Sequence, residues 1–366
     1  MKPTPSDAPA VLDGVRVLCL ASQFPGPFAC SLLGDLGADV ILVERPTGDP
    51  LRAMPWMFDA INRGARSVVI DLNSRDGREQ ALGLVETADV VVEGFRPGVA
   101  SRLGVDFDAC RAVRRELVYV SISGFGQTGP DRLLPAHDIG YQALAGLLDP
   151  ELSPWPPESP NSPPVHPLAD MAAGTFGALA VMAGLRARGP ATFIDLSMTE
   201  ALMSLAGTAI VAGLNQTGPA AVPYDPAYGA FNTADGRQVA LSIAFEQPAW
   251  QALCTELGLV ELAELDAWER RSRRGELQRA IADRIELRSA ADLLTALQIG
   301  GVPATRVNRL RELPDDTHLT DRGVLVTIEG TTFVRQPLVI DGTAPGPRRR
   351  SPKLGEHSDE LLGTLH

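Results

Sequence analysis

The sequence predicts an α/β protein: a large domain with a doubly wound, Rossmann-like and mostly parallel sheet, followed by a smaller α+β domain. Apolar strand-like runs alternate with helix-compatible stretches over the first half of the chain. The sequence pattern changes from about residue 228, where a hairpin pattern begins and charged helical segments follow. The 366 residues also exceed the size of one ordinary core, so two domains are expected.

The predicted strands of the large domain are continuous, apolar and rich in β-branched residues. This composition is typical of strands that are buried on both faces of a sheet. The segments are 15–21, 38–46, 66–72, 88–95 and 117–126. A first helix, "FACSLLGDLG", ends at Gly37, a natural C-terminal cap, and "SRDGREQALGLVETA" and "DACRAVRREL" favour further helices between the later strands. Strands that alternate with helices indicate a parallel sheet.

The second half of the chain is divided by proline-rich and glycine-rich connectors. Residues 150–167 are dense in proline and serine and predict a loop or linker. A helix-like stretch (168–189), a strand-like run (191–197) and another helix (198–214) follow, and a later hairpin is predicted to turn at Asp235 and Gly236. We therefore expect a large domain at 10–215, a small α+β domain at 225–320, and a C-terminal segment, 321–366, that returns to the large domain.

Composition excludes several classes of protein. The net charge of −12 argues against a broad nucleic-acid-binding surface, although a small basic pocket for one anionic ligand is compatible with it. The four cysteines have no CxxC spacing, which favours buried free thiols in a reducing compartment. No signal-peptide-like segment and no membrane-spanning run are recognised, so a cytoplasmic protein with no membrane partner is expected.

Arginines that follow the predicted strands indicate an anionic ligand. The loop "SQFPGP" lacks the GxGxxG fingerprint, so a dinucleotide is not indicated. Ligands of doubly wound sheets bind beyond the carboxyl ends of the strands, where Arg45, Arg96 and Arg102 are expected to hold a phosphorylated nucleotide. Phe95 would offer an apolar surface. The alternative is that these arginines simply face solvent. No metal-site, serine-triad or P-loop motif is present.

Two groups able to move a proton stand at predicted helix starts. His137 precedes "DIGYQALAGLL", and the positive end of that helix favours its neutral, proton-accepting form. Asp138 fits the role of an acid at a helix N-terminus. Asp170 opens the apolar helix "MAAGTFGALAVMAGL". A structural histidine and a plain helix cap are the alternatives for His137 and Asp170, so neither residue identifies an enzyme by itself.

Several motifs together resemble the family III CoA-transferases, in order and spacing, from about residue 12 to 362. They are "PGPFACSLLGDLGADVILVERP", "RGARSVVIDLNSRDGRE", "ADVVVEGFRPGVASRLGVD", "SISGFGQTGP", "FIDLSMTEAL", "GGVPATRVNRL" and "SPKLGEHSDELL". Within that family, "AHDIGYQALAG" followed by "LAD" some thirty residues later is most similar to the α-methylacyl-CoA racemase branch.

This resemblance implies roles for individual residues. His137 and Asp170 would flank the α-carbon of a bound thioester, Glu246 would orient the histidine, and desolvation would raise the pKa of Asp170. Backbone N–H groups at the helix start, such as that of Asp170, would stabilise the enolate. Contacts to CoA and to the thioester end are carried over to Arg45, Ile70, Leu72, Gly94, Phe95, Arg96, Arg102, Ala136, Asp138 and Tyr141. His166 stands four residues before Asp170, where racemases often have an amide, and would tune it or be a simple linker residue.

The leading hypothesis is therefore an acyl-CoA epimerase that inverts the α-carbon of 2-methyl-branched acyl-CoA thioesters by proton transfer through an enolate. The resemblance further implies an interlocked homodimer, CoA bound as part of the substrate, and no metal or redox cofactor. Two alternatives stay open. One is a CoA-transferase that moves CoA between carboxylic acids through an aspartyl–acyl anhydride at Asp170, and the other is a CoA-ester-binding protein without chemistry.

Overall fold

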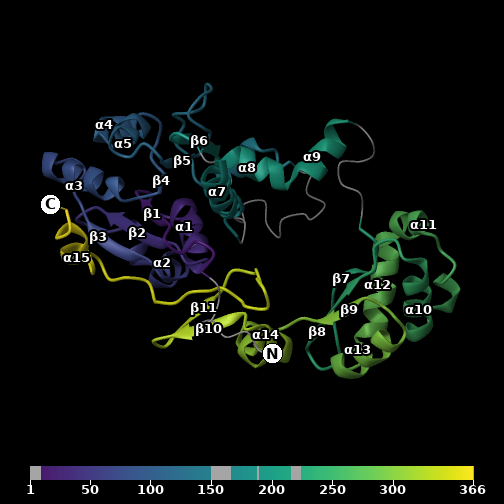
Figure 1. Ribbon diagram of the computed structural model, residues 1–366. Coiled ribbons are helices and arrows are strands. Elements are labelled where there is room, and N and C mark those ends of the chain that lie inside the picture. Colours follow the sequence, from purple (N-terminus) through teal and green to yellow (C-terminus); the bar gives the residue numbers. More distant parts are fainter. Residues whose placement is uncertain (1–9, 150–165, 188, 216–223, 366) are drawn as a thin grey trace. The chain divides into compact units, whose positions relative to one another are not determined.

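The computed structural model describes residues 10–149, 166–187, 189–215 and 224–365. The chain divides into two compact units, and each is considered by itself (Figure 1). The large unit comprises residues 1–215 and 317–366, and the small unit comprises residues 216–316. Most of the predicted proline-rich linker, residues 150–165, lies outside the described residues.

A six-stranded parallel sheet forms the centre of the large unit, in the order β3-β2-β1-β4-β5-β6. This is the doubly wound order, in which the chain reverses direction across the sheet between β1 and β4. The predicted fold class is confirmed. The strands are β1 (Arg16–Cys19), β2 (Asp39–Glu44), β3 (Arg66–Val69), β4 (Val90–Glu93), β5 (Val118–Ser123) and β6 (Thr192–Ser197).

Helices cover both faces of this sheet. One face packs against α1 and α7, and the other against α3, α4, α5 and α15. The helices of the large unit are α1 (Pro25–Asp35), α2 (Pro55–Asn62), α3 (Arg75–Glu86), α4 (Val99–Leu103), α5 (Phe107–Val113), α6 (Asp138–Leu144), α7 (Leu168–Ala187), α8 (Met198–Leu205), α9 (Gly207–Leu214), α14 (Thr317–Arg322) and α15 (Ser358–Leu362). The short 3₁₀ turn η2 (Pro50–Ala53) also belongs to the large unit, whereas η4 (Leu310–Asp315) belongs to the small unit.

Helix α7 is the central helix of the first face because its small residues allow close approach. A Cβ atom at Gly174 would lie 2.5 Å from the ring of Phe28 in α1, and one at Gly184 would lie 2.5 Å from Val118 in β5. Among the described residues, α7 is also the one helix long and apolar enough to cross a membrane by length and composition. Its contacts with α1, α6, α8 and β5 are those of a core helix.

The C-terminal segment protects the edge strand β3. The backbone N–H of His357 donates to the carbonyl of Ser67 at 2.9 Å, and the Ser67 hydroxyl accepts from the N–H of Gly355 at 2.9 Å. Helix α15 then packs against β3 and α3, as Figure 1 shows. An open strand edge would otherwise expose unpaired backbone groups. A hairpin of β10 (Leu325–Ile328) and β11 (Thr331–Val334) precedes this segment.

The small unit is an antiparallel sheet, β7-β8-β9, packed with helices, as the predicted α+β class requires. Its elements are β7 (Tyr228–Asn232), β8 (Gln238–Ser242), β9 (Ala304–Arg306), α10 (Gln247–Leu257), η3 (Val260–Leu262), α11 (Ala267–Ser272), α12 (Arg274–Ile285) and α13 (Ala290–Ile299). The predicted hairpin turn is confirmed: Gly236 has φ +68° between β7 and β8. In the core, Arg270 and Asp225 form a fully buried ion pair at 2.7 Å.

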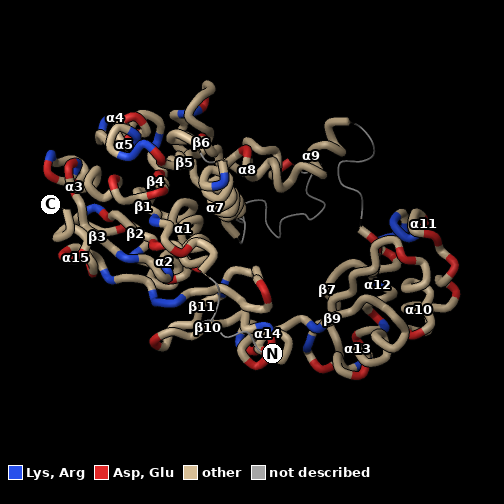
Figure 2. The backbone as a smooth tube through the Cα atoms, viewed as in Figure 1, with Lys and Arg blue, Asp and Glu red and all other residues tan. Residues whose placement is uncertain are grey.

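Charged residues of both signs are interspersed along the large unit (Figure 2). Many of them pair, such as Arg16 with Asp39 and Arg66 with Glu360. All four cysteines are free and buried, as their spacing predicted.

Candidate active site

A cavity of about 260 Å³ lies at the carboxyl ends of β1, β2 and β3. Doubly wound proteins bind their ligands at this edge of the sheet. Five residues that the sequence indicated for CoA line it: Arg45, Ile70, Leu72, Phe95 and Arg102. Asp71, in the strand end 70–72 that the resemblance indicated, and Glu44, at the end of β2, line it as well. Residues that sequence reasoning missed complete the wall: Leu20, Ala21, Ser22, Leu42, Val43, Gly48, Asp49, Asn73 and Leu103. The position of Ser22 shortly after β1 was the signal that could have found it.

Two arginines, Arg45 and Arg102, line this cavity. The guanidinium of Arg45 donates from Nε to the carbonyl of Gly48 at 2.9 Å, which fixes the side chain along the β2–η2 loop. Arg102 is exposed at the cavity wall, and no acidic group in the described part of the chain forms an ion pair with it. Guanidinium groups in this arrangement suit phosphate oxygens.

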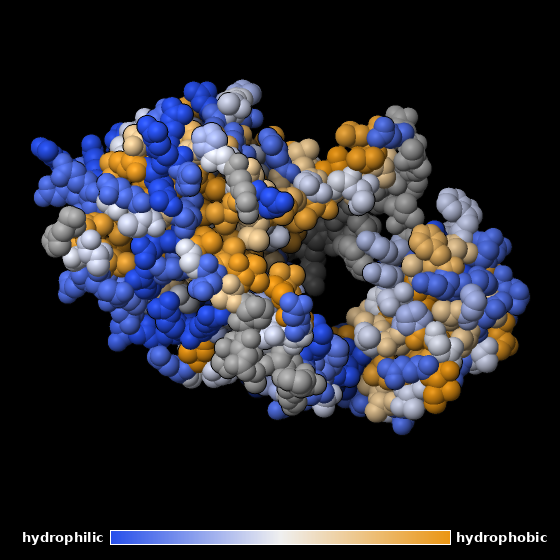
Figure 3. Space-filling model, viewed as in Figure 1, coloured by the Kyte–Doolittle hydropathy of each residue, from blue (hydrophilic) through white to orange (hydrophobic). Residues whose placement is uncertain are grey.

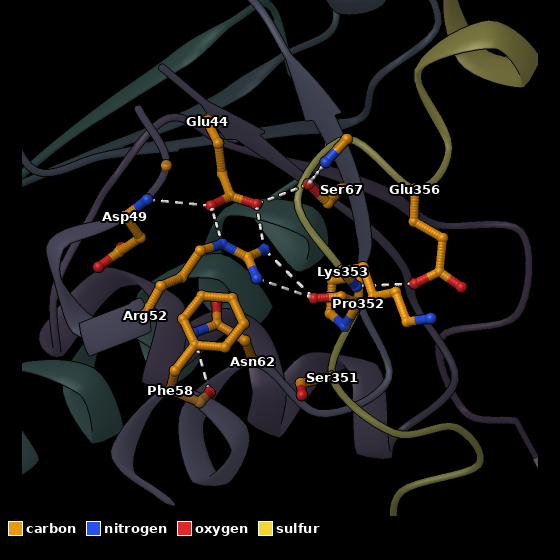
Figure 4. Close-up of polar contacts among 12 residues, drawn as sticks. Glu44, Asp49, Arg52, Phe58, Asn62, Ser67, Ser351, Pro352, Lys353 and Glu356 are labelled. Carbon is orange, nitrogen blue, oxygen red and sulfur yellow. Dashed lines mark hydrogen bonds and ion pairs between the residues drawn. The ribbon is translucent and has the colours of Figure 1, made fainter. Parts of the chain in front are cut away.

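Glu44 lines the same cavity, but its carboxylate is taken up by hydrogen bonds within the protein. Its buried carboxylate accepts from the N–H of Asp49 at 3.0 Å, from Arg52 at 2.6 and 2.7 Å, and from the Ser67 hydroxyl at 2.6 Å (Figure 4). Arg52 in turn donates to the carbonyl of Pro352 and lies 4.0 Å from the ring centroid of Phe58. This network ties the C-terminal segment to the floor of the cavity. The carboxylate of Glu44 is therefore engaged within the protein and not free to bind a ligand.

Asp138 and Asp170 stand at the starts of two helices that meet. The carboxylate of Asp138 accepts from the backbone N–H of Ala169 at 2.7 Å and of Asp170 at 3.0 Å, and from the side-chain amide of Gln142. It thus caps α7 from the first turn of α6. The resemblance assigned Asp138 to CoA, but three protein donors already occupy its carboxylate, so we interpret it as a structural cap.

The carboxyl group of Asp170 is unusually basic. Burial raises its pKa, and the neighbouring carboxylate of Asp138 raises it further, to about 7. Both the ionised and the protonated form of Asp170 are therefore populated near neutral pH. The pKa of the neighbouring Tyr141 hydroxyl is shifted as well. Burial raises it, the carboxylate of Asp170 raises it too, and the guanidinium of Arg96 lowers it.

Tyr141 is held by its surroundings on α6 and β5. Its hydroxyl donates to the carbonyl of Ala136 at 2.9 Å, and its ring packs on Gly124, where a Cβ atom would come within 2.4 Å. The ring of Phe125 meets it edge-on at 5.2 Å. Tyr141 therefore contacts Ala136 and lies within electrostatic reach of Asp170, while the assignment of these residues to the thioester end stays a prediction.

The expected oxyanion donors are the clearest correction. The backbone N–H groups of Ala169 and Asp170 donate to Asp138, and that of Met171 donates to the carbonyl of Pro167 at 3.0 Å. A substrate oxygen would compete with these bonds. The prediction that the start of α7 stabilises an enolate is therefore wrong, because a carboxylate of the chain already satisfies those donors.

The remaining residues predicted for the site do not take part in the contacts described above. His137 is exposed at the N-terminus of α6, and its imidazole makes no capping hydrogen bond. His166 is exposed too. Gly94 and Arg96 follow β4 but do not line the cavity. Glu246 belongs to the small unit, where the N–H groups of Ala244 and Phe245 donate to its carboxylate at 2.8 and 2.9 Å and lower its pKa. Its contact with His137 stays a prediction.

Gln23 is a further candidate site residue that the sequence analysis did not indicate. It follows β1 with φ +66°, a conformation that residues other than glycine rarely adopt. Its N–H donates to Asp49 at 2.9 Å, which holds the turn in place. Strained backbone of this kind concentrates at functional sites. The side chain is exposed at the ligand-binding edge of the sheet.

Comparison with known proteins identifies the family. The family described as CoA-transferase family III matches residues 12–358, and the chain belongs to this family. It is 33% identical to a succinyl-CoA:mesaconate CoA-transferase of Haloarcula hispanica, over 96% of this chain and 95% of that protein. It is 31% identical to a succinate–glutarate CoA-transferase of Agrobacterium fabrum, over 97% and 95%. A solved CaiB/BaiF family protein from Brucella suis superposes with a TM-score of 0.86 at 29% identity, covering 97% of this chain and 99% of that one.

The predicted family is therefore confirmed, and the chain is a family III enzyme. The names of these relatives favour the transferase alternative over the racemase hypothesis.

Proposed function

We propose that this protein is a CoA-transferase that moves CoA between carboxylic acids through an aspartyl–acyl anhydride on Asp170. The observation that carries the proposal is the partly buried Asp170 carboxyl, whose pKa of about 7 lies far above that of an ordinary aspartate. A more basic carboxylate is a stronger nucleophile, and burial strips it of the water that would weaken it. The transferase names of the relatives support the same reaction.

In the first step the ionised Asp170 carboxylate attacks the thioester carbonyl. The bond from the acyl carbon to the CoA sulfur breaks as the new bond to the aspartate oxygen forms, and CoA leaves as the thiolate. No proton, metal or redox group is needed for this exchange, because one anion replaces another. The CoA thiolate then attacks the aspartyl carbonyl of the anhydride, which releases the first acid as its carboxylate and leaves CoA as a thioester on Asp170. The incoming carboxylate displaces CoA to form a second anhydride, and the CoA thiolate attacks the new acyl carbon, so that the product thioester leaves and the Asp170 carboxylate is restored without hydrolysis.

The CoA moiety would occupy the cavity at the ends of β1, β2 and β3. Arg45 and Arg102 suit its phosphates, and Ile70, Leu72 and Phe95 offer it apolar surface. Arg96 directly follows Phe95 in the chain. It lies within electrostatic reach of Tyr141, which lies near Asp170. The thioester would then extend along this loop towards the nucleophile.

Short dicarboxylic acids are the proposed substrate class. Succinate, mesaconate and glutarate appear in the names of the relatives. The exposed guanidinium of Arg96 is a suitable partner for a second carboxylate, since Arg96 forms no ion pair within the described part of the chain.

We further propose a cytoplasmic homodimer. Helix α9 buries none of its residues within one chain. Leu205, which precedes it, is 61% exposed, and Val211 and Leu214 on it are 59% and 79% exposed. Figure 3 shows apolar surface over this helix. Apolar surface of this kind marks a protein interface. Sedimentation velocity of the wild type and of a Val211→Glu, Leu214→Glu variant tests it, with dissociation expected only for the variant.

Hydroxylamine trapping tests the reaction. Wild type incubated with succinyl-CoA and hydroxylamine should acquire a hydroxamate on Asp170, found by peptide mass spectrometry, whereas Asp170→Asn should acquire none. His137→Gln should keep the adduct and the transfer of CoA to a second acid.

The competing hypotheses predict different results. A racemase would exchange the α-proton of a 2-methyl-branched acyl-CoA with heavy water, dependent on His137, and would form no adduct. His137 next to Asp138 is the feature that favours it. A CoA-ester-binding protein would bind CoA thioesters but give neither adduct nor exchange.

A further inference from the structure

Glu93 is a buried acid that none of the steps above uses. It ends β4 and is 3% exposed. In the register of the sheet it lies beside Ser121 of β5, which lies beside Asp195 of β6. The three residues therefore form one row across neighbouring strands, and a buried acid in such a place needs hydrogen-bond partners.

The partners of Glu93 belong to the loop that follows it and to β5. Its carboxyl accepts a hydrogen bond from the backbone N–H of Phe95 at 2.7 Å and another from the Ser121 hydroxyl. Gln127 extends the row: its side-chain amide donates to the Ser121 oxygen at 2.8 Å, and its backbone N–H donates to Asp195 at 3.0 Å. The row therefore anchors the start of the loop 94–98 to the neighbouring strands.

This loop carries residues towards both halves of the site. Phe95 lines the cavity at the ends of β1, β2 and β3, whereas Arg96 acts electrostatically on Tyr141, beside Asp170. The loop ends at Gly98, whose φ of +84° turns the chain into α4, and Arg102 on α4 lines the cavity again. The Phe95 N–H bond to Glu93 ties the start of this loop to β4, and a turn bond from the N–H of Val99 to the carbonyl of Arg96 at 3.0 Å closes its other end.

We propose that Glu93 is a positioning residue for CoA: its carboxyl oxygen, held under the loop by Ser121, fixes Phe95 and Arg96 in the orientation that binds the thioester. The inference rests on the proposed binding of CoA in this cavity. The role depends on where the acceptor oxygen lies and does not depend on negative charge.

The surroundings of Glu93 explain why its position as a hydrogen-bond acceptor matters more than its negative charge. Burial raises its pKa to about 7, and the carboxylate of Asp195 adds to the rise, while the bonds from Ser121 and Phe95 oppose it. At neutral pH a large share of Glu93 is therefore protonated, and the neutral side chain still offers an acceptor oxygen to Phe95. A glutamine is accordingly a faithful replacement and an aspartate is not, because aspartate is one methylene shorter.

The test compares Glu93→Gln, Glu93→Asp and Glu93→Ala with wild type. Asp106→Asn is the matched control, since Asp106 lines a cavity of about 250 Å³ together with Glu93, Ser121 and Gln127, but caps α5 instead of the loop. The readouts are the dissociation constant of CoA by calorimetry, kcat and KM for succinyl-CoA, and hydrogen exchange of the Phe95 amide.

Positioning predicts that Glu93→Gln binds CoA within about threefold of wild type and keeps the Phe95 amide protected. Glu93→Asp and Glu93→Ala should raise the CoA dissociation constant and the KM about tenfold, with kcat changed less, and should speed exchange at Phe95. Asp106→Asn should match wild type in all three readouts.

The opposite order, with Glu93→Asp active and Glu93→Gln impaired, would show that the negative charge is what matters and overturn the proposal. Equal CoA binding and equal Phe95 protection in all variants would overturn it too. If the wild type binds no CoA, the proposed function fails, yet hydrogen exchange still decides whether Glu93 orders the loop. Should Glu93→Ala not fold, the comparison of glutamine with aspartate gives the answer.

Discussion

The carboxylate of Asp138, in the first turn of α6, accepts a hydrogen bond at 3.0 Å from the backbone nitrogen of Asp170, in the first turn of α7. One acid therefore both fixes the backbone of the candidate nucleophile and raises the pKa of its side chain. The two effects are separable by mutation, because a hydrogen-bond acceptor without charge keeps the first and removes the second.

The rate of transfer should follow the ionisation of Asp170. Because the attacking species is the carboxylate, kcat/KM for succinyl-CoA should rise with pH through about 7, the pKa of Asp170, and level off above it. In Asp138→Asn the repulsion is absent, so the rise should move to lower pH while the amide oxygen still caps α7. A pH–rate profile that is the same in both proteins would contradict this account.

Removal of the cap itself should cost stability. In Asp138→Ala the N–H groups of Ala169 and Asp170 lose their acceptor, which should lower the free energy of unfolding by about 1–2 kcal/mol. Urea denaturation of Asp138→Ala and Asp138→Asn measures it. We expect the asparagine variant to lie close to wild type, and an equal loss in both variants would mean that charge, not capping, is what α7 needs.

Asp170 should itself destabilise the fold at neutral pH. Its pKa in the folded protein lies above that of the unfolded chain, so ionisation opposes folding above the unfolded pKa, and the penalty is complete above the folded pKa of about 7. Asp170→Asn should therefore be more stable than wild type at pH 8 by roughly 1–3 kcal/mol, and close to it at pH 4.

Thermal or urea unfolding at the two pH values measures this difference. Asp108→Asn, an exposed acid paired with Arg111 on α5, is the control and should show no such pH dependence. A wild type more stable than Asp170→Asn at pH 8 would show that the carboxylate is paired in the fold and not merely buried.

Arg102 should bind the phosphates of CoA. Arg102→Gln is expected to weaken CoA binding about tenfold, and less at high salt, because a guanidinium–phosphate contact is lost. Calorimetry with CoA and with a pantetheine thioester, which lacks the nucleotide, measures it. Arg111→Gln, on α5, serves as control. Weaker binding of both ligands in Arg102→Gln would point to a damaged pocket instead of a lost phosphate contact.

The local pattern of the chain predicted the sheet and its ligand-binding edge. Buried parallel strands are read from short apolar runs, and each of β1 to β5 falls within a predicted run. Arg45 and Arg102 could be found because residues that follow parallel strands meet at one edge of the sheet. Glu93 was missed, since an acid at the end of a strand carries no sign in sequence of whether it faces solvent or holds a loop.

What the sequence by itself determined is the doubly wound fold, the family and the cavity arginines, because these depend on periodicity and on positions directly after strands. Only the tertiary structure decided that Asp138 caps α7 from 32 residues away, leaves no donor at that helix start for an enolate, and raises the pKa of Asp170. The physical reason is that hydrogen bonding and desolvation depend on which groups folding brings together, and spacing along the chain does not encode that meeting.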